Sequence, residues 1–178
     1  MNPIRTRWLR IAPAVVLAAA LGCGPAGATS LKDIEIGIRG INFLNDPPRG
    51  RIEVAVIQDG QNRASVQDAQ AISGWIAANR NPKVELVPVA VDVRDLDAAR
   101  YKVAIVALGQ EAHFPRILDF ARRNGALTIT ADLACVRSGS CVMGINSEPN
   151  VEVIVSRQAS AASGIGFVRA FHMMVKEY

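Results

Sequence analysis

The sequence predicts an α/β domain, in which a mostly parallel sheet is flanked by helices in a Rossmann-like three-layer arrangement, with a C-terminal β-hairpin and a terminal helix. Segments of strand character alternate with segments of helical periodicity from Arg51 to Thr130. The segment Lys102–Leu108 is apolar at nearly every position, as expected for a central parallel strand. Half of the chain is apolar, which suffices for a sizeable core.

The segment before the alternating region is predicted to be a helix, Leu31–Leu44. Its apolar residues recur at helical spacing, although two glycines leave a strand over Glu35–Ile38 as an alternative. The element should end at Asp46-Pro47-Pro48, because a residue before proline is disfavoured in the helical region.

The alternating region begins with a strand over Arg51–Ile57, which the turn dipeptide Asp59-Gly60 ends. A helix over Ala64–Asn79 follows, and Ser65 with Asp68 three residues later resembles a capping box. Val84–Val91 is the second strand. Because Pro88 within it lacks an amide donor, we expect this strand at an edge or with a bulge.

The clearest helix is Glu111–Asn124, which Gly125 should terminate as a C-cap. Leu127–Thr130 is the next strand. Two short apolar runs, Cys141–Ile145 and Val151–Val155, then predict a β-hairpin, followed by a helix over Arg157–Ser163. Phe167, Phe171 and Met174 recur at helical spacing toward the C-terminus and predict the terminal helix.

The N-terminus has the features of a secretory signal. Three arginines precede the apolar run Ile11–Gly22, which is too short to span a bilayer, and Ala26-Gly27-Ala28 fits a cleavage site. Residues 1–28 are therefore predicted to be a signal peptide and residues 29–178 a single exported domain. Lipidation at Cys23, which would give a membrane-anchored lipoprotein, is an alternative, and an uncleaved anchor is a weaker one.

Cleavage leaves Cys135 and Cys141, which in an oxidising compartment are expected to form a local disulfide. A metal pair or a redox pair are the alternatives. The first lacks nearby partners beyond Asp132, and the second usually has the closer spacing C-x-x-C.

Charge and motifs argue against several functions. Without the signal arginines the net charge is only about +1, so no nucleic-acid partner is expected. There is no phosphate-binding loop or catalytic signature. We expect no catalytic residue, metal or cofactor. His113 and His172 are expected in capping or surface roles, and the acidic cluster Asp92, Asp95 and Asp97 in a solvated loop rather than a cation site.

The mature chain resembles the YfiR/HmsC-like family of periplasmic proteins along nearly its whole length. The resemblance runs from a helix ending in a proline turn at Ile38–Pro48 to the segment Gly125–Ile129, the two cysteines, the strand Val151–Val155 and the step Ser163-Gly164-Ile165. One departure is that the family pattern Phe-Glu-x-Asn is replaced by Val153–Ser156.

The resemblance implies a non-catalytic regulator that binds the periplasmic part of a membrane signalling protein, a diguanylate cyclase or a sensor kinase. The best known kind of such proteins represses a diguanylate cyclase and so lowers cyclic di-GMP and biofilm formation. The resemblance also implies that disulfide state affects stability and that the chain forms homodimers. We take Ile154, Phe167, Phe171 and Met174 as candidate partner contacts, because Met and aromatic residues suit binding surfaces. The alternatives are a periplasmic small-molecule-binding domain and, less favoured, an enzyme on the same scaffold.

Overall fold

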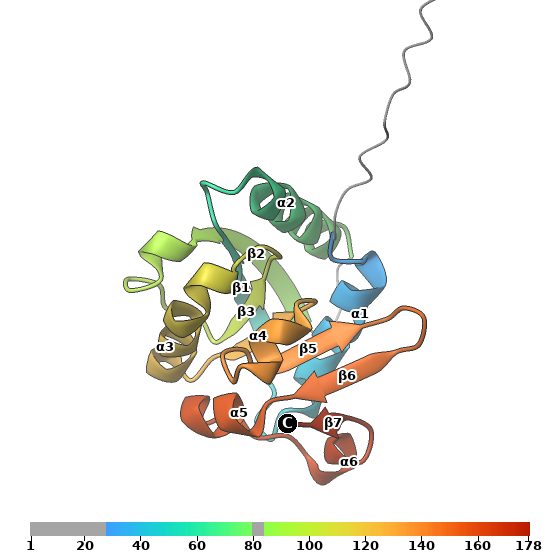
Figure 1. The fold of residues 1–178 in the computed structure, drawn as a ribbon. Helices are drawn as coiled ribbons and strands as arrows, with labels where there is room; N and C mark the ends of the chain where they lie inside the picture. Colours follow the sequence, from blue (N-terminus) through green and yellow to red (C-terminus); the bar gives the residue numbers. More distant parts are fainter. Residues whose placement is uncertain (1–27, 80–83) are drawn as a thin grey trace, which may run out of the picture.

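A computed structural model describes residues 28–79 and 84–178. The predicted signal segment and Cys23 lie outside these residues, except for Ala28. Within the described residues the helices and strands, shown in Figure 1, are α1 (Leu31–Gly40), β1 (Gly50–Gln58), α2 (Arg63–Ala78), β2 (Val84–Asp92), β3 (Val103–Val106), α3 (Phe114–Asn124), β4 (Leu127–Thr130), α4 (Leu133–Arg137), β5 (Met143–Asn146), β6 (Glu152–Val155), α5 (Arg157–Ser163), α6 (Arg169–His172) and β7 (Lys176–Glu177).

The strands form one sheet of order β2-β1-β3-β4-β5-β6-β7. β1 to β5 are parallel, β5 and β6 form the antiparallel hairpin, and β7 pairs parallel to β6. β2 lies on one side of β1 and β3 lies on the other, so the strand order reverses between β1 and β3. β2 is an edge strand, as Pro88 indicated.

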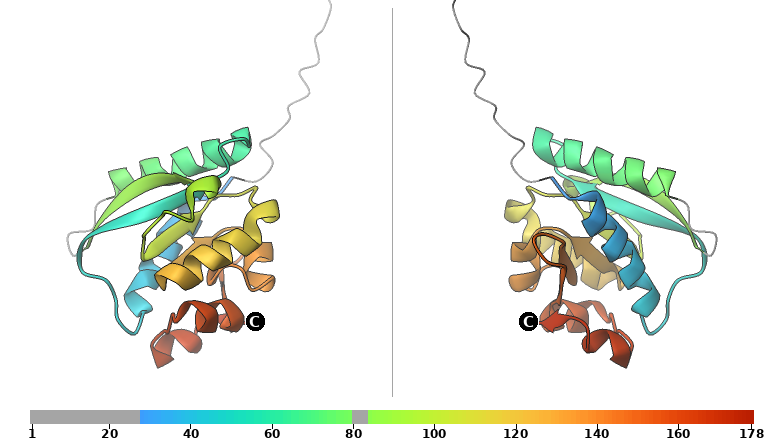
Figure 2. Two further views of the ribbon diagram at one scale, coloured as in Figure 1. Left: turned by 90° about the vertical axis from the view of Figure 1, so that its left-hand side faces the viewer. Right: turned by 90° about the vertical axis from the view of Figure 1, so that its right-hand side faces the viewer.

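Helices cover both faces of the sheet, which confirms the predicted α/β class (Figure 2). One core lies under α1 and α2 and includes Ile34, Ile72 and the inward side chains of β1, β3, β4 and β5. The other lies under α3 and α4 and includes Phe120 and both cysteines. The sheet is therefore apolar on both faces, as its continuous Val and Ile runs require.

Helix α1 packs unusually close to the sheet, and its two glycines explain how. A Cβ atom on Gly37 would lie 2.7 Å from Cγ2 of Ile129, and one on Gly40 would lie 2.7 Å from Cε of Met143. The glycines that weakened the helix prediction thus permit this approach. Ser30 caps the helix in a reciprocal capping box with Asp33.

Several predicted details differ from the structure. The capping box expected at Ser65 and Asp68 is absent from α2, because Asn62 caps this helix. Helix α4 was not predicted. The terminal helix is shorter than predicted and has only the four residues of α6, because the chain then turns and adds β7 to the sheet. The C-cap at Gly125 is confirmed by its left-handed φ of 55°.

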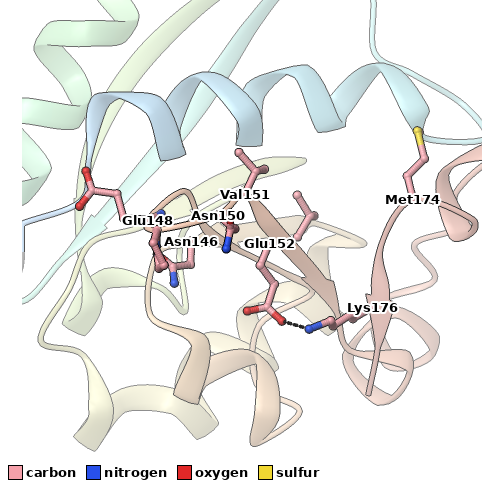
Figure 3. A pocket seen from close by; sticks show the side chains of 9 residues that line it. Asn146, Glu148, Asn150, Val151, Glu152, Met174 and Lys176 are labelled. Atoms are coloured by element: carbon pink, nitrogen blue, oxygen red, sulfur yellow. Dashed lines mark hydrogen bonds and ion pairs between the residues drawn. The ribbon is translucent and has the colours of Figure 1, made fainter.

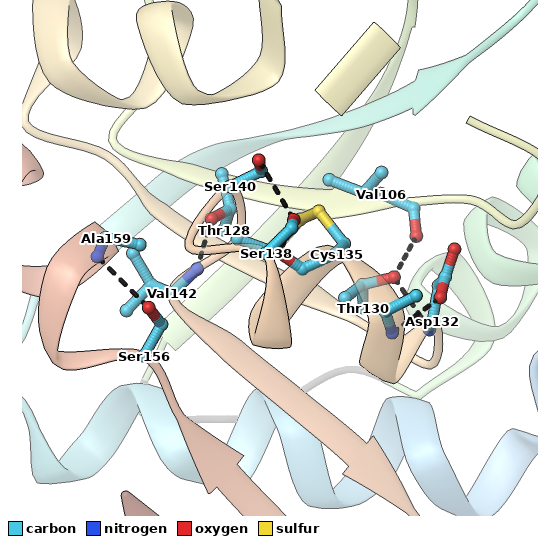
Figure 4. Close-up of a disulfide and its surroundings, with 12 residues drawn as sticks. Val106, Thr128, Thr130, Asp132, Cys135, Ser138, Ser140, Val142, Ser156 and Ala159 are labelled. Atoms are coloured by element: carbon cyan, nitrogen blue, oxygen red, sulfur yellow. Dashed lines mark hydrogen bonds between the residues drawn. A yellow bond between two sulfur atoms is a disulfide. The ribbon is translucent and has the colours of Figure 1, made fainter. Parts of the chain in front are cut away.

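The disulfide between Cys135 and Cys141 is present, with the two Cα atoms 5.2 Å apart (Figure 4). It closes the loop that follows α4, and both cysteines are fully buried. The neighbouring strand β4 carries two buried threonines whose hydroxyls have partners. Thr128 Oγ1 accepts from the Val142 amide at 2.8 Å, and Thr130 Oγ1 donates to the Val106 carbonyl at 3.1 Å.

Reducing this disulfide is expected to lower the free energy of unfolding by about 2 kcal/mol, because the bond closes only a short loop in the unfolded chain. Urea unfolding with and without dithiothreitol measures the difference. The double variant Cys135→Ala, Cys141→Ala is the control, since its stability should not respond to dithiothreitol. An unchanged unfolding midpoint of the reduced natural protein would contradict the expectation.

Candidate functional site

The four candidate partner contacts do not share one surface. Met174 is 60% exposed, but Ile154 is fully buried and Phe167 and Phe171 are each 5% exposed. For these three the assignment as contacts is corrected, because their side chains belong to the core. Phe171 stacks between Phe43 and Phe167 at centroid distances of 5.1 and 4.7 Å, and this stack anchors the C-terminal segment on the turn that follows α1.

A groove lies beside Met174, between the β5–β6 hairpin and the C-terminal segment (Figure 3). We call it the hairpin groove, and its cavity volume is about 340 Å³. Val151 at its side is 54% exposed, so two large apolar side chains there are open to solvent. The lining residues are Asn146, Glu148, Pro149, Asn150, Val151, Glu152, Val153, Met174 and Lys176.

The hairpin groove follows the part of β6 that β7 leaves uncovered. β7 pairs only with Ile154 and Val155, so the amino-terminal half of β6, at Glu152 and Val153, has no neighbouring strand on that side among the described residues. Lys176 Nζ donates to Glu152 Oε1 at 2.7 Å across the groove (Figure 3). This bond lowers the pKa of Glu152 and raises the pKa of Lys176, so the polar rim carries paired charges.

A second polar region occupies the carboxyl ends of β1 and β3, where the strand order reverses. In open α/β sheets this is the usual position of a ligand. Asp68 of α2 is 4% exposed and its Oδ2 accepts from the Leu108 amide, just after β3, at 2.9 Å. The same carboxylate accepts from the Thr29 amide at 2.7 Å and from Thr29 Oγ1 at 2.8 Å.

Ser65 is the second buried polar residue of this region. Its hydroxyl accepts from the Asp59 amide at 3.1 Å and from Gln110 Nε2 at 2.7 Å. Gln110 is 1% exposed, and its Oε1 has no hydrogen-bond partner among the described residues. Ser65 and Asp68 thus link the ends of β1 and β3 to α2, a role that the spacing did not reveal. The available signal for this role in the sequence was that both residues lie among the apolar positions on the buried face of the helix.

The remaining candidate polar residues form ordinary surface pairs. His113 Nε2 lies 3.6 Å from Asp59 Oδ2, and His172 contacts Glu177 and, at 3.2 Å, the Phe167 carbonyl. In the acidic cluster, the Arg94 guanidinium hydrogen-bonded to Asp92 holds the pKa of that carboxyl well below its usual range.

Asp97 of the same cluster pairs with Arg116 and Arg123, so its charge is also matched by arginine. In the described part of the chain no three His, Cys, Asp or Glu residues come together as metal ligands. None of the described helices has the length and apolar character needed to cross a bilayer.

Replacing Ser65 by alanine is expected to lower the free energy of unfolding by roughly 1 to 3 kcal/mol, because the buried Gln110 amide and the part-buried Asp59 amide lose their acceptor. Ser160→Ala is the matched control. The Ser160 hydroxyl oxygen is buried without a partner among the described residues, so its removal should cost almost nothing. Urea unfolding of both variants compares them, and equal losses would show that the Ser65 bonds contribute no stability.

Comparison with known proteins shows a shared fold and no family. No family model and no curated protein matches the sequence. A solved structure of a conserved domain protein from Vibrio cholerae is similar, with a TM-score of 0.58 and 12% identity over 81% of this chain and 59% of its own. An ABC domain in complex with L-Trp from Streptococcus pneumoniae has a TM-score of 0.59 and 8% identity over 82% of this chain and 60% of its own. The chain thus has the α/β fold of these structures and spans about 60% of their length.

Proposed function

We propose that this chain is a non-catalytic periplasmic regulator that binds the periplasmic part of a membrane signalling protein through the hairpin groove. The observation that supports this is the pairing of exposed Met174 and Val151 with an uncovered length of sheet edge. Flexible methionine and apolar side chains suit a surface that receives a partner. The signal-like N-terminus and the resemblance to YfiR/HmsC-like proteins support the compartment and the class of partner.

The partner element that fits best is an extended segment. Beside Glu152 and Val153 the edge of β6 is open, so an added strand could continue along the sheet where β7 leaves off. The apolar side chains of Val151 and Met174 would contact alternate residues of that segment. Asn146, Asn150 and the Glu152–Lys176 pair provide polar groups around them. A homodimer, predicted from the resemblance, stays a prediction.

Substituting Met174 by lysine is expected to reduce partner capture about tenfold, because a charge replaces a central apolar contact. Tagged protein is incubated with detergent-solubilised membranes, and retained proteins are quantified by mass spectrometry. Met173→Lys is the matched control: Met173 is 80% exposed but does not line the groove.

Both variants should keep the natural unfolding midpoint, since the replaced side chains are exposed. Oxidised and reduced protein are compared in parallel, and the oxidised form should retain more partner. Capture of the same membrane protein by all three chains would contradict binding through the groove. Failure to enrich any membrane protein would contradict the regulator function itself.

A second candidate function is small-molecule binding at the carboxyl ends of β1 and β3. Two observations favour it: the ABC domain of similar fold is in complex with L-Trp, and the strand order reverses at this position. The unpartnered Oε1 of buried Gln110 is an acceptor that a ligand donor could satisfy.

This function predicts that L-Trp, used as the probe, raises the thermal unfolding midpoint of the natural protein. Gln110→Met should abolish that shift while leaving the domain folded. L-Leu is the control ligand, because it has the same amino and carboxyl groups without the indole. The absence of any shift up to millimolar L-Trp would remove L-Trp as the ligand, and equal shifts with both amino acids would show no selectivity for the indole.

A further inference from the structure

Asp68 is a buried carboxylate without a cationic partner among the described residues. Its side chain is 4% exposed on the sheet-facing side of α2, and no described Lys, Arg or His forms an ion pair with it. Three neutral donors surround it: the Thr29 amide, the Thr29 hydroxyl and the Leu108 amide. Buried carboxylates ordinarily need a matching charge as well as hydrogen bonds, because burial removes their hydration.

The closest of these donors is the nitrogen atom that follows the predicted cleavage site. Thr29 N lies 2.7 Å from Asp68 Oδ1, the shortest of the three bonds. Thr29 is 7% exposed, whereas Ala28 immediately before it is exposed. The bond that signal processing is predicted to break thus joins an exposed residue, Ala28, to a buried one, Thr29.

We propose that cleavage after Ala28 supplies the missing charge, and that the α-ammonium group of Thr29 forms a buried ion pair with Asp68. Hydrolysis adds one water across the Ala28–Thr29 amide. The Ala28 carbonyl carbon takes the oxygen as a carboxylate and leaves with the signal peptide. The Thr29 nitrogen becomes an ammonium group, which is protonated at neutral pH. A neutral donor next to Asp68 is replaced by a cation at the same position.

This ion pair would make the final fold depend on processing. Asp68 also binds the Leu108 amide, and Leu108 precedes Gly109 and Gln110 at the carboxyl end of β3. The new N-terminus therefore stabilises the polar region between β1 and β3 through one carboxylate. This inference rests on the predicted cleavage site and is independent of the hairpin groove.

The first experiment exports the full-length chain and identifies the mature N-terminus by mass spectrometry, which should find Thr29. A second full-length chain carries one glycine inserted between Ala28 and Thr29, so that processing after Ala28 leaves an amide at Thr29. The folded-to-unfolded ratio of the natural mature protein should be at least about tenfold higher than that of the glycine-inserted protein, because only the natural protein has an ammonium group at Thr29 beside Asp68. A mature chain that begins elsewhere, at Cys23 for example, would overturn the proposal.

Asp68→Asn in both chains separates the charge from the added glycine. The glycine should cost little in the Asp68→Asn background, where no ion pair can form, and an equal cost in both backgrounds would contradict the ion pair. If Asp68→Asn prevents folding, the rate at which the Thr29 amine is acylated tests the ion pair instead. The Thr29 amine of the folded natural protein should react at least about tenfold more slowly than in urea, since a paired, buried ammonium is a poor nucleophile. Equal rates would show a free N-terminus.

Discussion

The buried carboxylate of Asp68 is the contact on which the arrangement of this domain depends most. It joins the segment before α1, helix α2 and the end of β3, which are distant in the sequence. Ser65, one turn earlier on the same helix, joins the ends of β1 and β3. Because buried donors and acceptors are costly to leave unpaired, these bonds fix how α2 lies over the sheet and leave the region between β1 and β3 polar.

At the β6–β7 edge of the sheet, apolar contacts hold the C-terminal segment in place. The stack of Phe43, Phe167 and Phe171 fixes the C-terminal segment against the loop after α1. The Tyr178 amide then donates to the Val155 carbonyl at 2.9 Å, and the Tyr178 carbonyl accepts from the Arg157 amide at 2.8 Å. A segment fixed at these points presents Met174 beside the uncovered half of β6. The buried phenylalanines thus position the exposed methionine rather than contacting a partner themselves.

Much of the fold could be predicted because its signals are local. The apolar runs define the strands, Pro88 places β2 at an edge, and Gly125 ends α3. The features that could not be predicted depend on contacts between distant residues. The spacing of Ser65 and Asp68 suits a capping box, but their actual partners lie in the segment before α1 and in the loops after β1 and β3. Likewise, the periodicity of Phe167, Phe171 and Met174 suits a helix, but pairing with β6 draws Lys176 and Glu177 into the sheet.

The most direct test of the proposed function is site-specific photo-crosslinking in intact cells. A photoreactive amino acid replaces Met174 in the hairpin groove or Gln67, an exposed residue of α2. If the groove receives the partner, illumination should link position 174 to one membrane protein through its periplasmic part, and position 67 should give no such product. A crosslink to that protein from position 67 alone, or none from position 174, would contradict the account.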